Sequence, residues 1–402
     1  MFASPTAERG RKRWVFGLGA VGLAIALTAV ATLAPSGRAV VTGAVVPPAD
    51  EVIATVPKAD PARREAEVRA AAGDLAAAIA VARADIGLGR QTADPRYLGH
   101  AQAVLAPWWN QAAPPDQVLI LRATIRQALH DFTGARSDLD GLLARRPDDG
   151  QALLTRAVVA GVVGDRVTAR RDCDAVTRVL GELYGAACVA PLAAAHRQGP
   201  AAYHRLDQAI AQARGTAAAS WAQTALGELA RANGDDDAAE LAFRNALAVD
   251  PADLYTLAAL ADLLLDAGRP AEVVALVGDP TADNLILRQA IALTRTGAPT
   301  ATATTAGIRA RVDAAIERGD ALHLRERARF YLELDHDPAA AVKAARANWD
   351  IQREPADARI LLEAAAAAHD RAAAAPVLAW MDAEGIDDAI LVRARRAVEG
   401  SR

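Results

Sequence analysis

Few residues in this sequence could perform acid–base, nucleophilic or metal chemistry, and they are widely spaced. Histidine occurs only seven times, at positions 100, 130, 196, 204, 323, 336 and 369. None of these stands in an HExxH motif, which would put two imidazoles on one helix face to hold zinc. Two cysteines, Cys173 and Cys188, fall short of the four ligands that a structural zinc site needs. The sequence therefore predicts no metal site.

Motifs of the other active-site classes are also missing from the sequence. There is no GxxxxGK[ST] phosphate loop, and Gly17, Gly19 and Gly22 stand in an apolar segment where small residues serve helix packing. No serine stands in a GxSxG motif. The acidic run 235–237 opens a predicted helix, where carboxylates cap exposed backbone N–H groups. We expect a protein that is not an enzyme, with no cofactor and no small-molecule substrate.

Cys173 and Cys188 could form a disulfide. Their spacing places them on consecutive antiparallel helices, where a bridge is possible if the two Cα atoms are close enough. Alternatively, both are small buried hydrophobic side chains. The sequence leaves both interpretations open.

Composition favours helices and disfavours a nucleic-acid partner. The 402 residues are 52% hydrophobic but only 4% aromatic, with many Ala, Leu, Arg and Glu residues, which are good helix formers. Lys and Arg number 45 against 49 Asp and Glu, a net charge of −4 without a basic field to hold a polyanion. We therefore expect an all-α protein that does not bind nucleic acid.

The N-terminal region predicts membrane attachment and export. A basic tip at 1–13 precedes 14–34, an uncharged stretch long enough to cross a bilayer, and the preceding Arg and Lys residues favour a cytoplasmic tip. Residues 35–58 then contain several prolines and no helical period, typical of a flexible linker. This predicts a single-pass inner-membrane protein with its body on the periplasmic or extracytoplasmic side. The alternative is a secretory signal cleaved near Ala29-Val30-Ala31, which would release the body into the periplasm.

Beyond the linker, turns recur at a regular interval. They stand at Gly73-Asp74, His130-Asp131, Gly164-Asp165, Gly234-Asp235, Gly268-Arg269 and His369-Asp370. Several neighbouring turns lie about 34 residues apart, the period of a helical-repeat array. In five of these six turns an alanine follows five residues after the first turn residue, and such a small side chain lets two helices approach closely. These alanines are Ala78, Ala135, Ala169, Ala239 and Ala374.

The segment 220–253 resembles a tetratricopeptide repeat (TPR) and is the clearest unit. The resemblance rests on Leu226 and Gly227 in its first helix, Ala239, Phe243 and Ala246 in its second, and Pro251 after it. The segment 116–149 repeats the scheme with Ala135 and Pro147, and Ala169 occupies the equivalent place in the next unit. The 116–149 segment departs from the family at Arg122 and Arg126, where apolar residues are preferred. The chain is thus similar to bacterial-type TPR proteins with an N-terminal anchor or signal.

The resemblance implies a right-handed superhelical solenoid of about eight or nine antiparallel helix pairs over 59–402. Each pair is too small to fold alone, so neighbouring pairs must stack to bury their apolar faces. Family members line their concave side with the first helix of each pair. On that alignment the groove receives Trp221, Glu228, Arg231, Tyr255, Asp262, Arg295, Glu326, Arg359 and Glu363.

This mixed-charge groove with two aromatic residues predicts a protein or peptide partner. The Lys and Asn set that clamps peptide C-termini in some TPR proteins does not occur here, so we expect an extended peptide or a partner protein instead. The predicted function is a non-catalytic, membrane-tethered interaction scaffold on the exported side of the membrane. The alternative is an accessory or chaperone-like subunit that assists maturation or assembly of an exported enzyme complex.

Overall fold

The computed structural model describes residues 61–400 except 72, 195–197, 214–216 and 320–322. The described residues form α-helices without a β-strand, which confirms the all-α expectation. The predicted tip, membrane segment and linker lie outside the described residues. None of the helices in the described part of the chain is both long and apolar enough to span a bilayer.

The helices follow one another through short connections. Their bounds are α1 (Pro61–Ala71), α2 (Leu75–Thr92), α3 (Arg96–Val104), α4 (Ala106–Trp109), α5 (Asp116–Ala128), α6 (Phe132–Arg145), α7 (Gly150–Val162), α8 (Arg166–Leu180), α9 (Glu182–Ala194), α10 (Gly199–Gln212), α11 (Ala217–Ala232), α12 (Asp236–Val249), α13 (Leu254–Asp266), α14 (Pro270–Val277), α15 (Asp283–Thr296), α16 (Ala301–Glu317), α17 (Leu324–Glu333), α18 (Pro338–Trp349), α19 (Pro355–Ala367), α20 (Arg371–Glu384) and α21 (Ala389–Gly400).

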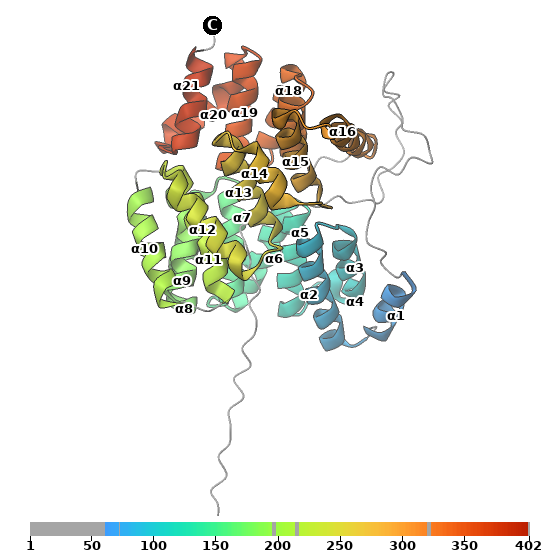
Figure 1. Ribbon diagram of the computed structural model, residues 1–402. Helices are drawn as coiled ribbons and strands as arrows, with labels where there is room; N and C mark the ends of the chain where they lie inside the picture. Colours follow the sequence, from blue (N-terminus) through green and yellow to red (C-terminus); the bar gives the residue numbers. More distant parts are fainter. Residues whose placement is uncertain (1–60, 72, 195–197, 214–216, 320–322, 401–402) are drawn as a thin grey trace, which may run out of the picture.

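Most of these helices form consecutive antiparallel pairs that stack along the chain (Figure 1). The pairs are α1/α2, then α5/α6 and each following pair up to α19/α20. The short helices α3 and α4 lie between the first two pairs, and α21 packs on α19 after the last one. The array therefore has the alternation of first and second helices that a solenoid requires.

An aspartate caps the second helix of many pairs, directly after a residue with positive φ. Asp165 and Asp235 accept hydrogen bonds from the backbone N–H of Thr168 and Ala238, which satisfies a donor at the helix start. The preceding Gly164 has φ 83°, a left-handed conformation that glycine adopts without a Cβ clash.

Histidines occupy the same left-handed position in other turns. His130 and His369 have φ of 59° and 52°. Each is followed by an aspartate that caps the next helix, Asp131 or Asp370. The ring of His130 stacks on Phe132 at 5.4 Å between centroids. These two histidines therefore serve the turn geometry.

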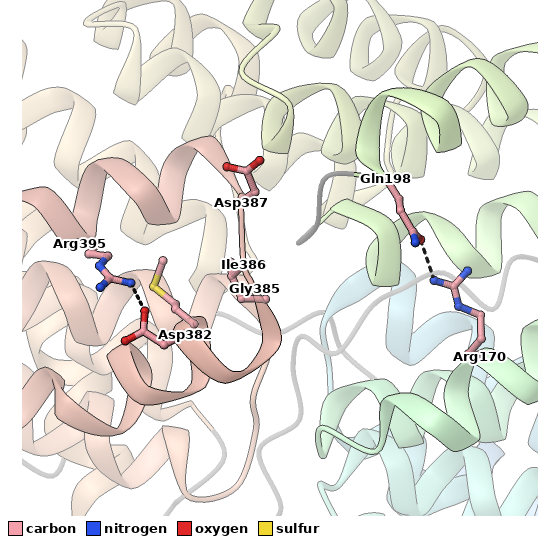
Figure 2. Close-up of a pocket in the computed structure, with 8 residues that line it drawn as sticks. Arg170, Gln198, Asp382, Gly385, Ile386, Asp387 and Arg395 are labelled. Atoms are coloured by element: carbon pink, nitrogen blue, oxygen red, sulfur yellow. Dashed lines mark hydrogen bonds and ion pairs between the residues drawn. The ribbon is translucent and has the colours of Figure 1, made fainter.

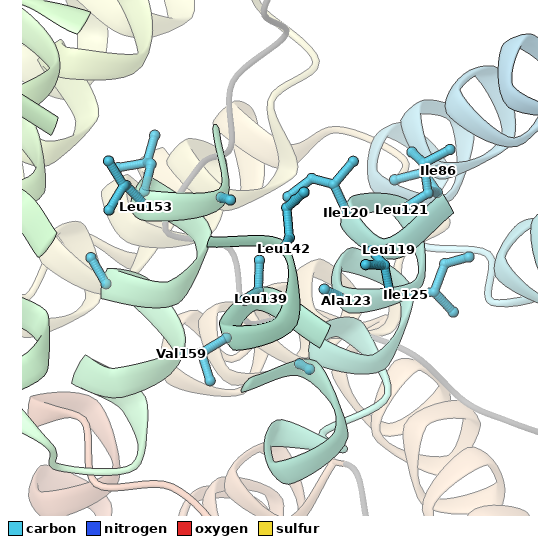
Figure 3. Packing of buried hydrophobic residues seen from close by; sticks show 14 of the residues in the cluster. Ile86, Leu119, Ile120, Leu121, Ala123, Ile125, Leu139, Leu142, Leu153 and Val159 are labelled. Carbon is cyan, nitrogen blue, oxygen red and sulfur yellow. The ribbon is translucent and has the colours of Figure 1, made fainter. Parts of the chain in front are cut away.

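Small residues set the distance between the two helices of a pair. The five alanines that follow the turns are completely buried: Ala78, Ala135, Ala169, Ala239 and Ala374. In the 220–253 unit, Leu226, Phe243 and Ala246 are also buried, while Pro251, like Pro147, lies exposed in a turn between pairs. Figure 3 shows the same mode of packing in the N-terminal cluster, where side chains of α5, α6 and α7 gather together.

A disulfide joins the second helix of one pair to the first helix of the next. Cys173 of α8 and Cys188 of α9 are bonded, with their Cα atoms 5.5 Å apart. Both side chains are buried, at 1% and 7% exposure. The covalent bond closes a loop of fifteen residues and, in the chain-entropy account, stabilises the fold by about 3 kcal/mol.

The array curls back so that its C-terminal helices meet the α7/α8 pair. The backbone N–H of Arg353, between α18 and α19, donates to the carbonyl of Val162 at the end of α7, 2.8 Å away. Arg166 at the start of α8 lies 3.5 Å from Glu384 at the end of α20. Ile351 packs against the N-terminal hydrophobic cluster. These contacts hold the α18–α19 connection and the end of α20 against α7 and α8.

Gly227 provides a test of the close helix contact in the 220–253 unit. A Cβ at Gly227 would lie 2.5 Å from the ring of Phe243, which is fully buried, so the ring or the helix would have to shift. We expect Gly227→Ala to destabilise the protein by about 1–3 kcal/mol through overpacking. The matched control is Gly141→Ala in α6, where a Cβ meets nothing within 4 Å and alanine favours the helix. Thermal unfolding of both variants decides, and equal melting temperatures would contradict the packing.

Candidate interaction surface

The first helices α11, α13, α15, α17 and α19 contribute charged side chains to one connected network on the inner side of the array. Every groove residue predicted from the sequence except Trp221 takes part in it. The network has three parts, centred on Asp262, on Asp266 and on Glu228. We describe it below as the inner charge network.

Asp262 of α13 holds two arginines from two other helices. Its carboxylate accepts from Arg288 of α15 at 2.8 and 2.6 Å and forms an ion pair with Arg329 of α17. Burial opposes ionisation of Asp262, but these two guanidinium groups outweigh it and hold its pKa well below the usual range. The Asp262 carboxylate thus links α13 to Arg288 and Arg329, which follow it in the sequence by 26 and 67 positions.

Asp266, one turn further along α13, makes the second junction. Arg359 of α19 donates to both of its oxygens at 2.7 Å, and Arg231 of α11 forms an ion pair with it. Burial again opposes ionisation, and Arg359 and Arg231 outweigh it, so the pKa of Asp266 is lowered. Arg359 also donates to Glu363 at 2.7 Å. One carboxylate therefore connects residues 93 positions apart.

Glu228 of α11 is the centre of the third part of the network, where burial favours the neutral form of its carboxyl group. The hydroxyl of Tyr255 donates to its carboxylate. Burial raises the pKa of Glu228 to about 7, against the opposing effect of this hydrogen bond and of nearby Arg231. Burial and the Glu228 charge together raise the pKa of Tyr255 well above 10. Near neutral pH, therefore, Glu228 gains or loses a proton while Tyr255 stays protonated and donates to it.

Arg325 of α17 lies beside this pair and faces carboxyl groups at the start of α19. It donates to Glu354 at 3.0 Å, and its Nε lies 2.8 Å from Asp357. Burial raises the pKa of Glu354 to about 7 and also raises the pKa of Asp357. Burial also acts to raise the pKa of Glu326, but the charge of the adjacent Arg325 outweighs it, so the pKa of Glu326 is lowered.

The outer rim of the network is more accessible. Arg295 of α15 donates to the carbonyl of Leu265 and to Glu333 of α17, both at 2.8 Å. The side chains of Arg295 and Glu363 are 38% and 33% exposed, more than those of Arg231, Asp262 and Arg359. A peptide approaching the inner surface would meet these two groups before the buried ones.

Trp221 does not join the inner charge network. Its ring lies 6.1 Å from that of Tyr184 on α9, and it is partly buried against a cluster that includes Leu183 and Tyr203. Packing between neighbouring pairs therefore accounts for this side chain. Its predicted role as a partner anchor stays a prediction.

Several residues of the network were not predicted from the sequence. The arginines Arg288, Arg325 and Arg329 and the acids Asp266, Glu333, Glu354 and Asp357 all stand on, or at the start of, first helices. The four-residue spacing of Arg325 and Arg329 on α17 was an available signal, since it places both on one helix face. Their partners could not be read from spacing, because these lie on other helices.

The two arginines that depart from the TPR pattern have a structural role. Arg122 donates to Asp138 at 2.9 and 2.6 Å, and Arg126 donates to the same carboxylate at 2.8 Å. In the following pair, Arg156 holds Asp172 in the same way at 2.6 and 2.9 Å. Arg156 and Asp172 each follow Arg122 and Asp138 by 34 residues. A buried ion pair thus repeats with the period of the array.

The guanidinium and carboxylate groups of the inner charge network can exchange their ion-pair partners reversibly. Guanidinium and carboxylate groups bind oppositely charged groups by paired hydrogen bonds. Among the described residues, no group of three or more His, Cys, Asp or Glu side chains is placed to hold a metal ion. The inner surface is therefore suited to recognising charged side chains.

Comparison with known proteins adds little to this description. No family model matches the sequence, and no match was found among curated proteins. Among solved structures, the chain is similar to yeast Tom70, with a TM-score of 0.39 and 14% identity, over 72% of this chain and 65% of that one. It is also similar to the TPR domain of P58(IPK), with a TM-score of 0.22 and 15% identity, over 82% of this chain and 99% of that one. The helix-pair architecture therefore rests on the contacts described above.

The raised pKa of Glu228 predicts a pH-dependent stability. The folded pKa is about 7 against 4.5 for an unperturbed glutamate, so the stability from protonated Glu228 is complete below about pH 4.5 and is lost as the pH rises through 7. Glutamine cannot ionise but still accepts from Tyr255. We expect Glu228→Gln to be more stable than wild type by about 1–3 kcal/mol at pH 8 and to differ little near pH 4.5.

Thermal unfolding at the two pH values measures this difference. Glu317→Gln, which changes an exposed carboxyl at the end of α16, serves as the control and should follow wild type at both. A Glu228→Gln variant that gains no stability at pH 8 would show that Glu228 is solvated.

Proposed function

We propose that this protein is a non-catalytic scaffold that binds an extended peptide or partner protein along its inner surface. The observation that supports this most is the convergence of side chains from α11, α13, α15, α17 and α19 on one inner charge network. Five first helices contribute to a single surface of alternating positive and negative groups. Such a surface can select a partner by its charge pattern.

The partner would bind by replacing the outer ion pairs of the network. Arg295 with Glu333 and Arg359 with Glu363 are partly exposed pairs. An exposed pair contributes only about 0–1 kcal/mol, so exchange for a peptide carboxylate or guanidinium costs little. The pairs at Asp262 are more buried and would stay in place, because leaving a buried charge unpaired costs several kcal/mol.

We further propose that the body lies in an oxidising, exported compartment and is tethered through 14–34. Support comes from the Cys173–Cys188 bond, since disulfides persist outside the cytoplasm and are rare within it. The basic tip followed by an uncharged segment is the second support. Both supports agree with cleaved-signal export as the alternative to a retained anchor.

Photo-crosslinking tests the inner surface. A crosslinking amino acid is placed at 295 and at 363, on the accessible rim, and at 241 and 249 as controls on the outer surface, where Leu241 and Val249 are 63% and 64% exposed. We expect one and the same partner to be captured from 295 and 363 in cells but not from 241 and 249. Capture from the outer positions alone, or equally from all four, would refute binding on the inner surface.

Thiol labelling tests the compartment. After cells are acid-quenched and their protein is denatured, Cys173 and Cys188 of the full chain should resist alkylation until a reductant is added, because the exported pair is oxidised. A variant without residues 1–34 should be kept in the cytoplasm and be labelled without reductant. Labelling of the full chain to the same extent as the truncated one would rule out export of the body.

A further inference from the structure

Helix α8 presents an arginine-rich face on the outside of the array. Arg166, Arg170 and Arg178 stand four or eight residues apart on one side, and Arg171 stands beside them. Val167 lies among them with 83% of its surface exposed, the most exposed large hydrophobic side chain in the described part of the chain. We call these five residues the α8 arginine face. Over twelve residues the stripe is about 18 Å long.

The charges of this face are poorly neutralised, in contrast to the inner charge network. Arg170 donates to the neutral amide of Gln198 at 3.2 Å, and neither it nor Arg178 forms an ion pair with a described residue. Arg171 reaches Asp172 at 3.1 Å, but that carboxylate is already held at 2.6 and 2.9 Å by Arg156. Uncompensated positive charge therefore remains on the surface.

The positive groups of this face also repel one another. Arg166 donates to the carbonyl of Leu192 at 2.7 Å and lies 3.5 Å from Glu384. Burial lowers the pKa of Arg166, and the charge of Arg170 lowers it further despite Glu384. A carboxylate placed between these guanidinium groups would relieve the repulsion.

The face is an open, shallow surface on α8, formed by its five residues and Asp174. Arg170 also borders a cavity of about 620 Å³, between α8 and α10 on one side and the loop from α20 to α21 on the other (Figure 2). Met381 and Ile386 form the apolar part of the wall of this cavity. Asp382 and Asp387 line it on the side opposite Arg170.

The buried side of helix α8 is anchored to the neighbouring helix α9. Cys173 on its buried side is bonded to Cys188 of α9, and Asp172 and Cys173 are each 1% exposed. Asp165 caps its N-terminus. The spacing of the arginines is therefore fixed before any partner arrives, which reduces the entropic cost of binding.

We propose that the α8 arginine face is a docking site for an acidic segment of a partner protein. Carboxylates of the segment pair with Arg170, Arg171 and Arg178, and an apolar side chain covers Val167. Asp174 beside the face and Asp387 across the cavity are negatively charged, whereas Asp382 is paired with Arg395, so a protein segment of mixed composition fits better than a continuous phosphate backbone. The inference rests on the proposed scaffold function and gives the chemistry of one partner.

Fluorescence anisotropy with a defined probe tests this docking site. The probe is a short fluorescein-labelled poly-glutamate peptide with a central leucine pair, added to the full chain in a mild non-ionic detergent. We expect binding that weakens as salt rises from about 50 to about 300 mM. The triple variant R170Q/R171Q/R178Q should bind about tenfold more weakly. The same peptide with glutamine in place of glutamate should not bind.

The matched control is R346Q/R371Q/R396Q, which removes three exposed arginines that form no ion pair with a described residue. It should bind the probe like wild type. Val167→Asp is a second variant that leaves the core untouched, since the side chain is 83% exposed. It should weaken binding because its carboxylate occupies the centre of the face. Melting temperatures establish that each variant is folded.

Three results would overturn the proposal. The first is failure of the glutamate peptide to bind, and the second is equal weakening by both triple variants. The third is binding of anionic phosphatidylglycerol vesicles through the α8 arginines without any binding of the peptide, which would make the face a membrane contact. The scaffold function fails separately, through the crosslinks from 295 and 363, since neither position belongs to this face.

Discussion

Two carboxylates on α13, Asp262 and Asp266, fasten the inner side of this protein together. Each accepts from two arginines that belong to different helices, so α13 is tied to α11, α15, α17 and α19 at once. Removing water from these charges is costly, and their mutual attraction repays that cost only when the geometry is good. The network therefore contributes little net stability for the charges that it buries, while it links five first helices to one another.

This fastening depends on close packing between helices. Buried alanines at the same place in successive pairs, and Gly227 against Phe243, let first and second helices approach closely. A tight coil brings pairs that are far apart in sequence within hydrogen-bond distance. The hydrogen bond from Arg353 to Val162 is a second example of such a contact. With longer side chains at these positions, the helices would be further apart and the inner arginines would not reach α13.

The two candidate surfaces differ in their physics. The inner charge network is internally paired and contains carboxyl groups with pKa values of about 7, at Glu228 and Glu354. Its binding would therefore respond to pH near neutrality. The α8 arginine face carries always protonated groups that are only partly neutralised, on a helix fixed by a disulfide. Its binding would respond to salt rather than to pH.

The sequence by itself determined the local structure of the described residues. Helix-forming composition, glycine or histidine before a capping aspartate, and alanine five residues later are local features, and they sufficed to predict helices, turns and the small-residue contacts. Cysteine spacing was enough to suggest the bridge from α8 to α9 without establishing it. Only the tertiary structure decided how the charges pair. The rotation between successive pairs accumulates along the array, so spacing alone could not place Arg329 beside Asp262 or Arg359 beside Asp266, 67 and 93 residues away. For the same reason the sequence grouped Glu228, Tyr255 and Trp221 in one groove, whereas the tertiary structure pairs the partly buried Glu228 with Tyr255 and packs Trp221 near Tyr184.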